Sequence, residues 1–131
     1  MKIVDALIRK ENYTTEITAR SHKILSDEPI EKKGSDKGLS PGELLAASLA
    51  SCTSITLRMY ANRKEYDIQS INTKVELIKA SEENKENRFI REIQIEGNID
   101  ETIQKRMMQI ANLCPVHKIL ELGSKIETQI I

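Results

Sequence analysis

The sequence has few aromatic residues and no excess of charge of either sign. Its 131 residues include one Phe, three Tyr and no Trp, so stacking platforms for nucleic-acid bases or sugars are not expected. Twenty basic side chains balance twenty acidic ones, which leaves no electrostatic footprint for nucleic acid or for an anionic membrane. We therefore expect neither nucleic acid nor a membrane as a partner.

Targeting signals, long apolar runs and repeats are also lacking. Residues 1–5 contain no basic segment followed by an apolar run, and no stretch approaches the apolar length that spans a bilayer. The expected compartment is the cytoplasm, and the absence of linkers favours a single domain over residues 1–131. The two cysteines suit redox chemistry or metal binding better than a structural disulfide in that reducing compartment.

The N-terminal third has the pattern of a β-meander. Short β-type runs at residues 4–10, 14–20 and 23–26 are separated by plausible tight turns at Glu11-Asn12 and Ser21-His22. The following stretch, residues 30–39, is charged and contains two glycines, so it is predicted to be an exposed loop.

A long helix is predicted next, with one cysteine in its middle. Ser40 can cap the helix, Pro41 suits its first position, and Glu43 can complete a capping box. The helix should end near Arg63, and residues 44–57 carry no charge. A helix that is apolar all round is normally buried all round, so this is predicted to be the central buried helix, bearing Cys52.

The C-terminal half predicts a long β-hairpin, two helical pieces and a closing strand. Residues 68–80 and 89–99 alternate in polarity around a polar tip at residues 81–87. Asp100 should cap a second helix, and Cys114-Pro115 should break it and start a short third piece. The apolar stripe of the second helix consists of Ile103, Met107, Ile110 and Ala111, and the closing strand is expected at Ile126, Thr128 and Ile130. The fold class is α+β.

The two cysteines lie 62 positions apart, which leaves their role open on spacing alone. A peroxide can oxidise one thiolate to a sulfenic acid that a second thiol converts to a disulfide, if the fold brings both together. The alternative is that both are small buried hydrophobes. A zinc site built from His22, Cys52, Cys114 and His117 is a third reading, although only Cys114 and His117 have ligand-like spacing.

The local contexts of the two sulfurs differ. Cys114 precedes Pro115 and is predicted to occupy a helix N-cap, where free backbone N–H groups favour a thiolate. Cys52 lies about 16 Å along its helix from Pro41, in an apolar setting that raises the pKa of its thiol. By this reasoning Cys114 is the better intrinsic thiolate, and Cys52 needs a cation supplied from elsewhere in the fold.

Four segments resemble the OsmC/Ohr family of organic hydroperoxide reductases, which are peroxiredoxin-like thiol peroxidases. Residues 40–53, ending in Ser51-Cys52-Thr53, resemble the signature helix of that family. Ser26-Asp27-Glu28-Pro29, residues 57–64 and Cys114-Pro115-Val116-His117 are similar to its OsmC-like branch, in the same order. The resemblance spans nearly the whole chain.

The resemblance implies a fold, an assembly and a mechanism. It implies an OsmC-like intertwined homodimer with each active site at the subunit interface. It also implies reduction of organic hydroperoxides in oxidative-stress defence, without metal or bound cofactor, followed by reduction of the protein by a dithiol. Cys52 would be the peroxidatic cysteine and Cys114 the resolving one, with their disulfide as the product. This assignment replaces the order that the helix-dipole argument gives.

The sequence departs from the family pattern at the activating residues. The hydroperoxide-resistance branch has a Glu directly after the Pro of the signature helix, where this chain has Gly42. Glu43 points about 100° away on a helix, so that role is not transferred to it. The family's activating Arg comes from the N-terminal strands, where Arg9 is the first positional match and Arg20 the second. The hypothesis from another class is a non-catalytic small-ligand-binding or interaction protein of the same fold.

Overall fold

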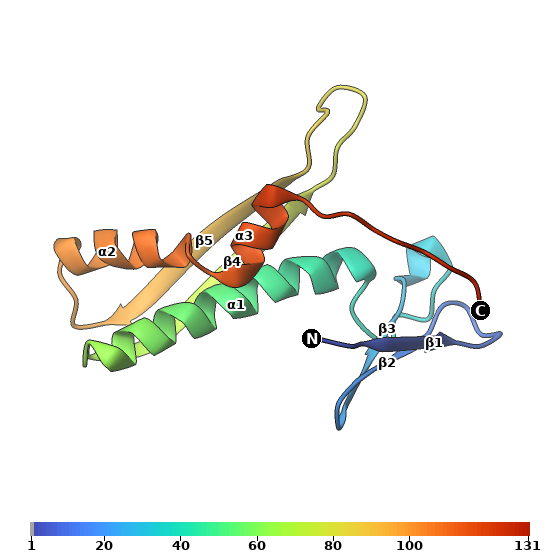
Figure 1. Ribbon diagram of the computed structural model, residues 1–131, viewed down its shortest axis with the longest axis horizontal. Coiled ribbons are helices and arrows are strands. Elements are labelled where there is room, and N and C mark those ends of the chain that lie inside the picture. The colour runs from blue at the N-terminus through green and yellow to red at the C-terminus, as the bar shows by residue number, and fades with distance from the viewer. Residues whose placement is uncertain (1) are drawn as a thin grey trace. The chain divides into compact units, whose positions relative to one another are not determined.

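The computed structural model describes residues 2–131 and has an α+β architecture, as predicted (Figure 1). Three helices and one short 3-10 helix accompany two antiparallel sheets, of order β1-β2-β3 and β4-β5. In chain order the elements are β1 (Asp5–Ile8), β2 (Thr15–Ala19), β3 (His22–Ser26), η1 (Ile30–Lys32), α1 (Pro41–Arg63), β4 (Ile68–Ile78), β5 (Arg88–Gly97), α2 (Glu101–Ala111) and α3 (Pro115–Leu122).

The chain forms two compact units, Met1–Leu45 and Ala46–Ile131. The first holds the three-stranded sheet and the loop before α1. The second holds most of α1, the hairpin and the two C-terminal helices. The expectation of a single domain over residues 1–131 stays a prediction.

The N-terminal meander is confirmed, with one turn shifted by a residue. Strand β2 pairs with both neighbours, and Ala19 lies opposite His22. His22 is therefore already part of β3, and the tight turn is formed by Arg20 and Ser21 instead of Ser21 and His22. Arg20 adopts a φ of 56°, the left-handed conformation that such two-residue turns require.

A buried carboxylate organises the loop that follows β3. Asp27 is 2% exposed, and its side chain accepts hydrogen bonds from three separate segments of the first unit. Burial pushes the pKa of Asp27 upward, but the hydrogen bonds from the Thr14 hydroxyl and from backbone N–H groups outweigh it and hold the pKa at about 2. The donors are Tyr13 N, Thr14 Oγ1, Glu28 N, Ser35 N and Lys37 N.

The capping box predicted for α1 is present. The Ser40 backbone N–H donates to Glu43 Oε2 at 2.8 Å, and the Glu43 N–H donates back to Ser40 Oγ at 3.3 Å. The helix starts at Pro41 and ends at Arg63, also as predicted. These local residues are sufficient to fix where the helix begins.

Within one chain α1 is buried on one side only, and burial of its other faces by a dimer stays a prediction. Its buried side chains are Leu49, Thr53, Leu57, Tyr60 and Ala61, which follow one helical stripe. On other faces Leu45, Ile55 and Met59 are 43%, 55% and 67% exposed. The physical reason is that the packed elements of one chain cover only one side of a helix with no polar face.

Helix α1 also corrects the expectation about apolar length. By length and composition it is the one helix within residues 2–131 that could cross a membrane. This is weak evidence, because the core helix of a soluble protein meets the same criterion, and the buried stripe of α1 forms the core.

The hairpin β4-β5 carries its apolar side chains on the face toward α1. Residues Ile71, Thr73, Val75 and Leu77 of β4 are half-buried while their neighbours in the strand are mostly exposed. Two polar contacts fix α1 to β4. Ser54 Oγ and Thr73 Oγ1 lie 2.8 Å apart, and Arg58 Nη1 donates to the Ile68 carbonyl at 3.0 Å.

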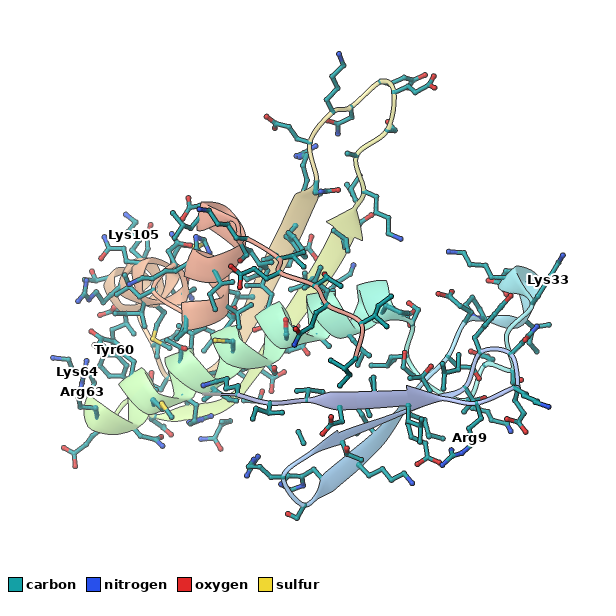
Figure 2. All side chains as sticks on the ribbon, turned by 45° about the vertical axis from the view of Figure 1, so that its right-hand side comes forward. Arg9, Lys33, Tyr60, Arg63, Lys64 and Lys105 are labelled. Carbon is teal, nitrogen blue, oxygen red and sulfur yellow. The ribbon has the colours of Figure 1, made fainter. Side chains whose placement is uncertain are left out.

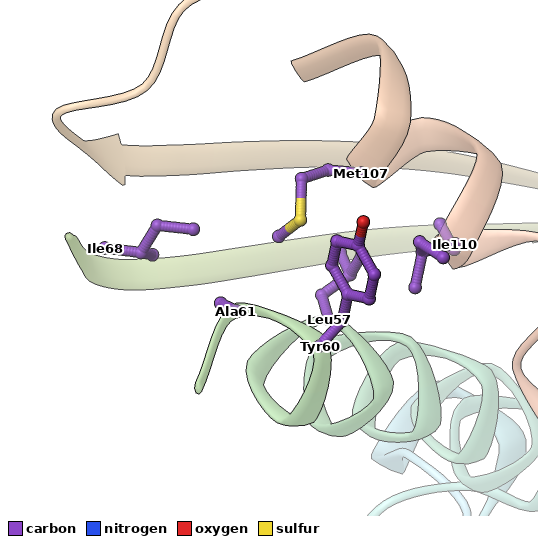
Figure 3. Close-up of a cluster of buried hydrophobic side chains, with 7 residues drawn as sticks. Leu57, Tyr60, Ala61, Ile68, Met107 and Ile110 are labelled. Atoms are coloured by element: carbon purple, nitrogen blue, oxygen red, sulfur yellow. The ribbon is translucent and has the colours of Figure 1, made fainter. Parts of the chain in front are cut away.

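The main core lies between α1, β4 and α2 (Figure 3). Leu57 is fully buried, and its burial stabilises the fold by about 2 kcal/mol. The cluster consists of Leu57, Tyr60, Ala61, Ile68, Met107, Ile110 and Ala111, so the stripe predicted for α2 does face the core.

Cations surround the aromatic ring at the end of α1. The centres of charge of Arg63 and Lys64 lie 5.4 and 5.9 Å from the Tyr60 ring centroid (Figure 2). The Tyr60 hydroxyl accepts from Arg106 Nε at 3.2 Å, and this bond lowers the pKa of Tyr60. These contacts tie the end of α1 to α2.

The C-terminal helices match the predictions, but the closing strand does not. Asp100 caps α2 by accepting from the Ile103 N–H at 2.8 Å. Residues 123–131 form no strand in the structure. Ile126 and Ile130 are 89% and 100% exposed, so their alternation has no sheet within residues 2–131 to pair with.

Candidate functional site

Cys52 lies in the middle of α1, beside the buried stripe of that helix. Its neighbour Thr53 is fully buried between Leu49 and Leu57, whereas Cys52 itself is only half-buried. One position along a helix turns a side chain by about 100°, so Cys52 stands at the edge of the core. The sulfur is therefore held by a rigid element and remains partly open.

Cys114 occupies the N-cap of α3, as the sequence predicts. Its Sγ accepts a hydrogen bond from the His117 backbone N–H at 3.3 Å, and Pro115 follows in the first turn. The Cys114 side chain is completely buried. Since the first N–H groups of a helix have no partner within it, the sulfur fills a place that a Ser or Asp oxygen usually takes.

The fold brings the two sulfurs together. The side chains of Cys52 and Cys114 are hydrogen-bonded to each other, and the Val116 backbone N–H also donates to Cys52. Both cysteines are free thiols. The first turn of α3 thus offers one N–H to each sulfur, from Val116 and from His117.

The surroundings raise the pKa of the Cys52 thiol. Burial is the largest cause, and the adjacent Cys114 adds to it. Hydrogen bonds from the Val116 N–H and the Thr56 hydroxyl act in the opposite direction without overcoming burial. The pKa of the Cys52 thiol therefore stays raised by its surroundings in this part of the chain.

A polar network that the sequence analysis missed reaches Cys114 through the Thr53 hydroxyl. Arg91 Nη1 donates to Thr53 Oγ1 at 3.0 Å and to the Ala111 carbonyl at 3.3 Å, and Arg91 Nη2 donates to Asn112 Oδ1 at 2.8 Å. The Thr53 hydroxyl in turn lies 3.9 Å from Cys114 Sγ. The network joins β5, α1 and the segment between α2 and α3.

A signal for Arg91 is present in the sequence. Within β5 the half-buried positions are Phe89, Arg91, Ile93 and Ile95. The arginine therefore occupies a position on the inward, otherwise apolar face of an alternating strand. It lies opposite Val75, which is on the inner face of β4. A charged residue at such a position needs polar partners, and this requirement marks it as unusual.

The activating residues expected from the resemblance lie in the unit Met1–Leu45, whereas Cys52 lies in the other unit. Arg9 Nη1 contacts Glu16 Oε1 at 3.1 Å, and Arg20 forms the β2–β3 turn. Gly42 is in the first turn of α1. The Glu43 carboxylate accepts a hydrogen bond from the Ser40 backbone N–H in the capping box.

The zinc reading gains no support from the geometry. Within residues 2–131, no three His, Cys, Asp or Glu side chains form a group that could hold a metal ion. The His117 imidazole Nε2 instead lies 3.3 Å from Glu121 Oε2. A groove of about 300 Å³ exists elsewhere, and neither cysteine lines it; its residues are Ile93, Gln94, Ile95, Gln104, Met107 and Met108.

Comparison with known proteins gives one family. The family model described as OsmC-like protein matches residues 34–129, while no curated protein matches the chain. A similar solved structure is the OsmC like protein from Mycoplasma pneumoniae, with a TM-score of 0.78 and 20% identity over 92% of this chain and 87% of that one.

Two further structures are similar. A putative osmotic stress induced and detoxification response protein from Psychrobacter arcticus 273-4 has a TM-score of 0.76 and 26% identity, covering 90% of this chain and 87% of that one. The organic hydroperoxide resistance protein OhrB of Bacillus subtilis has a TM-score of 0.59 and 21% identity, covering 90% of this chain and 88% of that one. These likenesses establish an OsmC-like fold.

Proposed function

The chain belongs to the OsmC-like family, and we propose that it is a thiol peroxidase that reduces organic hydroperoxides with Cys52 and Cys114. The observation that carries the proposal is the hydrogen bond between these two thiols, which come from positions 62 residues apart. Two thiols that interact directly are placed for one to attack the other once it has been oxidised. The reaction serves the detoxification of peroxides under oxidative stress.

Cys52 is the peroxidatic residue in this proposal. Its thiolate attacks the terminal oxygen of the hydroperoxide, the O–O bond breaks, and the departing alkoxide takes a proton to become the alcohol. Cys52 is thereby oxidised to a sulfenic acid. The exposures of the two sulfurs support this order, because Cys52 is half-buried and open to a substrate while Cys114 is completely buried.

Cys114 resolves the sulfenic acid. Its thiolate attacks the Cys52 sulfur, an S–S bond forms, and hydroxide leaves and is protonated to water. The N-cap position supports this role, because the His117 N–H donates to the sulfur that must carry the negative charge. A dithiol reductant then returns both cysteines to thiols, so the cycle uses neither metal nor bound cofactor.

The relatives support the choice of substrate. OhrB of Bacillus subtilis is an organic hydroperoxide resistance protein, and the structural match covers 88% of that chain. The residues of α1 around Cys52 are also mainly apolar, with Leu45 and Ile55 exposed near it along the helix. Such side chains favour a substrate with an apolar group.

The site is completed by a second copy of the chain in this proposal. The exposed apolar side chains of α1 and of residues 123–131 support an intertwined homodimer that covers them. The same assembly would supply Arg9 or Arg20 as the cation that activates Cys52, and the dimer would act in the cytoplasm. Sedimentation should show a dimer at micromolar concentration; a stable folded monomer would contradict this part of the proposal.

The activity is tested by counting thiols. Free thiols are titrated before and after one equivalent of an alkyl hydroperoxide, with the alcohol product measured in parallel. We expect the loss of both thiols per chain and one equivalent of alcohol. Two thiols that remain free with no alcohol formed would favour the non-catalytic binding protein instead.

A further inference from the structure

The basis of this inference is a cation held beside the buried thiol without a counter-charge. Arg91 is half-buried on the inner face of β5, and the three groups that accept hydrogen bonds from it are all neutral: Thr53 Oγ1, the Ala111 carbonyl and Asn112 Oδ1. Among residues 2–131 no carboxylate forms an ion pair with it. A guanidinium with neutral partners keeps its positive charge uncompensated, so it can stabilise a negative charge that forms nearby.

The Thr53 hydroxyl connects this cation to Cys114. Its single proton has two acceptors within reach, the Leu49 carbonyl at 2.7 Å and Cys114 Sγ at 3.9 Å. Arg91 Nη1 donates to the same oxygen at 3.0 Å, which leaves the hydroxyl free to act as a donor and makes it a stronger one. With a neutral thiol the shorter bond to Leu49 is favoured. A thiolate at Cys114 would attract the proton instead.

We propose that Arg91 is a positioning residue that acts through the Thr53 hydroxyl to stabilise and aim the Cys114 thiolate at the Cys52 sulfur. This inference rests on the proposed function, and it concerns the resolving step only. In that step the Cys114 thiolate forms the S–S bond, the S–O bond of the Cys52 sulfenic acid breaks, and hydroxide leaves and is protonated to water. Arg91 also holds the segment that carries Cys114, through Ala111 and Asn112.

Within residues 2–131, the contacts of these sulfurs and of Arg91 come from α1, α3 and the end of α2. From α1 the titratable neighbour is Cys52, which is hydrogen-bonded to Cys114. From α3 it is His117, whose backbone N–H faces Cys114 while its imidazole contacts Glu121. The end of α2 presents neutral groups at Ala111 and Asn112. Among the described residues, Arg91 is the cation that hydrogen-bonds into this network.

The test measures thiolate formation at Cys114 without peroxide. In a Cys52→Ser background, ultraviolet thiolate absorbance is titrated against pH, and the same protein with Cys114→Ser supplies the blank for Tyr and His. Thr53→Val removes the hydroxyl, whereas Thr53→Ser keeps it and is the matched control. We expect Arg91→Gln and Thr53→Val to raise the pH midpoint by about one unit, and Thr53→Ser to keep the parent value.

The kinetic readout follows from that shift. With Cys52 intact, Thr53→Val should slow disulfide formation about three- to tenfold near neutral pH, because the thiolate fraction falls while its nucleophilicity rises slightly. Because the resolving step is slower in Thr53→Val, more sulfenic acid on Cys52 should accumulate in this variant than in wild type. Equal midpoints for Thr53→Val and Thr53→Ser would overturn the inference, and this pair decides the question even if Arg91→Gln fails to fold.

The two proposals fail separately. A midpoint difference in the Thr53 pair, together with no reaction toward hydroperoxide, would sink the proposed function and leave the network around Cys114 intact. Normal peroxide reduction with equal midpoints would sink the role of Arg91 and leave the proposed function standing.

Discussion

The two cysteines lie side by side and differ in how far each is exposed. Cys52 stands on the flank of a long apolar helix, half-buried, where burial raises the pKa of its thiol. Cys114 is completely buried, yet a helix N-terminus and the Thr53 hydroxyl surround it with donors. The difference that remains is one of access: Cys52 is partly open and Cys114 is not. In the proposed function the accessible sulfur meets the oxidant and the buried sulfur resolves the product.

Removing the accessible sulfur should have the largest effect. We expect Cys52→Ser to abolish hydroperoxide consumption, because the remaining sulfur at Cys114 is fully buried. Peroxide loss is followed by a coupled or direct assay against wild type. If Cys52→Ser keeps single-turnover reactivity and Cys114→Ser is inert, the roles are reversed.

Removing the buried sulfur should leave one turnover. Cys114→Ser still has the Cys52 thiol, so it should consume about one equivalent of hydroperoxide per chain and then stop as a sulfenic acid or over-oxidise. Mass spectrometry with a sulfenic-acid-specific reagent measures the stalled product. Sustained turnover in this variant would show that Cys114 has no resolving role.

The activating cation should account for a smaller, graded effect. The pKa of Cys52 is raised by burial within its own unit, so without a cation the peroxide step speeds up as pH rises toward that pKa. A cation lowers the pKa and moves this rise to lower pH. We expect one of the variants Arg9→Ala and Arg20→Ala to move the rise in rate to higher pH. The reaction of that variant should be about tenfold slower near neutral pH.

The variant that leaves the pH–rate profile unchanged serves as the control for the other, since both substitutions remove an exposed arginine from the same unit. Profiles that coincide with wild type for both would mean that neither arginine activates Cys52. The cation would then have to come from another part of the chain.

Substrate preference should be the smallest effect. An alkyl or aryl group that buries about 60 Å² of apolar surface near Cys52 gains about 1.5 kcal/mol, which is roughly tenfold in rate. Cumene hydroperoxide should therefore react about tenfold faster per thiol than hydrogen peroxide. Stopped-flow rate constants measured side by side decide this, and an equal or reversed preference would contradict an apolar setting for the substrate.

The sequence predicts those parts of the fold that depend on local residues. The capping box of Ser40 and Glu43, the N-cap of Cys114 and the alternation of the hairpin all appear as expected, because each is determined within a few positions. Predictions that need a partner surface fared worse. Residues 126–130 alternate like a strand, but nothing within residues 2–131 pairs with them. The outer side of α1 is exposed for the same reason.

The site was predicted in part. The resemblance selects Cys52 and Cys114, and the fold brings them into hydrogen-bonding distance. Strand alternation identifies apolar inward positions, whereas the partners of the inward-facing Arg91 come from α1 and from the end of α2. Long-range polar contacts of this kind cannot be obtained from local patterns.

The central claim is that one chain carries both halves of the redox pair. The most direct measurement mixes unlabelled and isotope-labelled chains, allows subunits to exchange, adds one equivalent of cumene hydroperoxide, and maps disulfide-linked peptides without reduction. The account predicts a Cys52–Cys114 linkage in which both peptides carry the same label. Mixed-label linkages, or two free thiols after the peroxide is added, would contradict it.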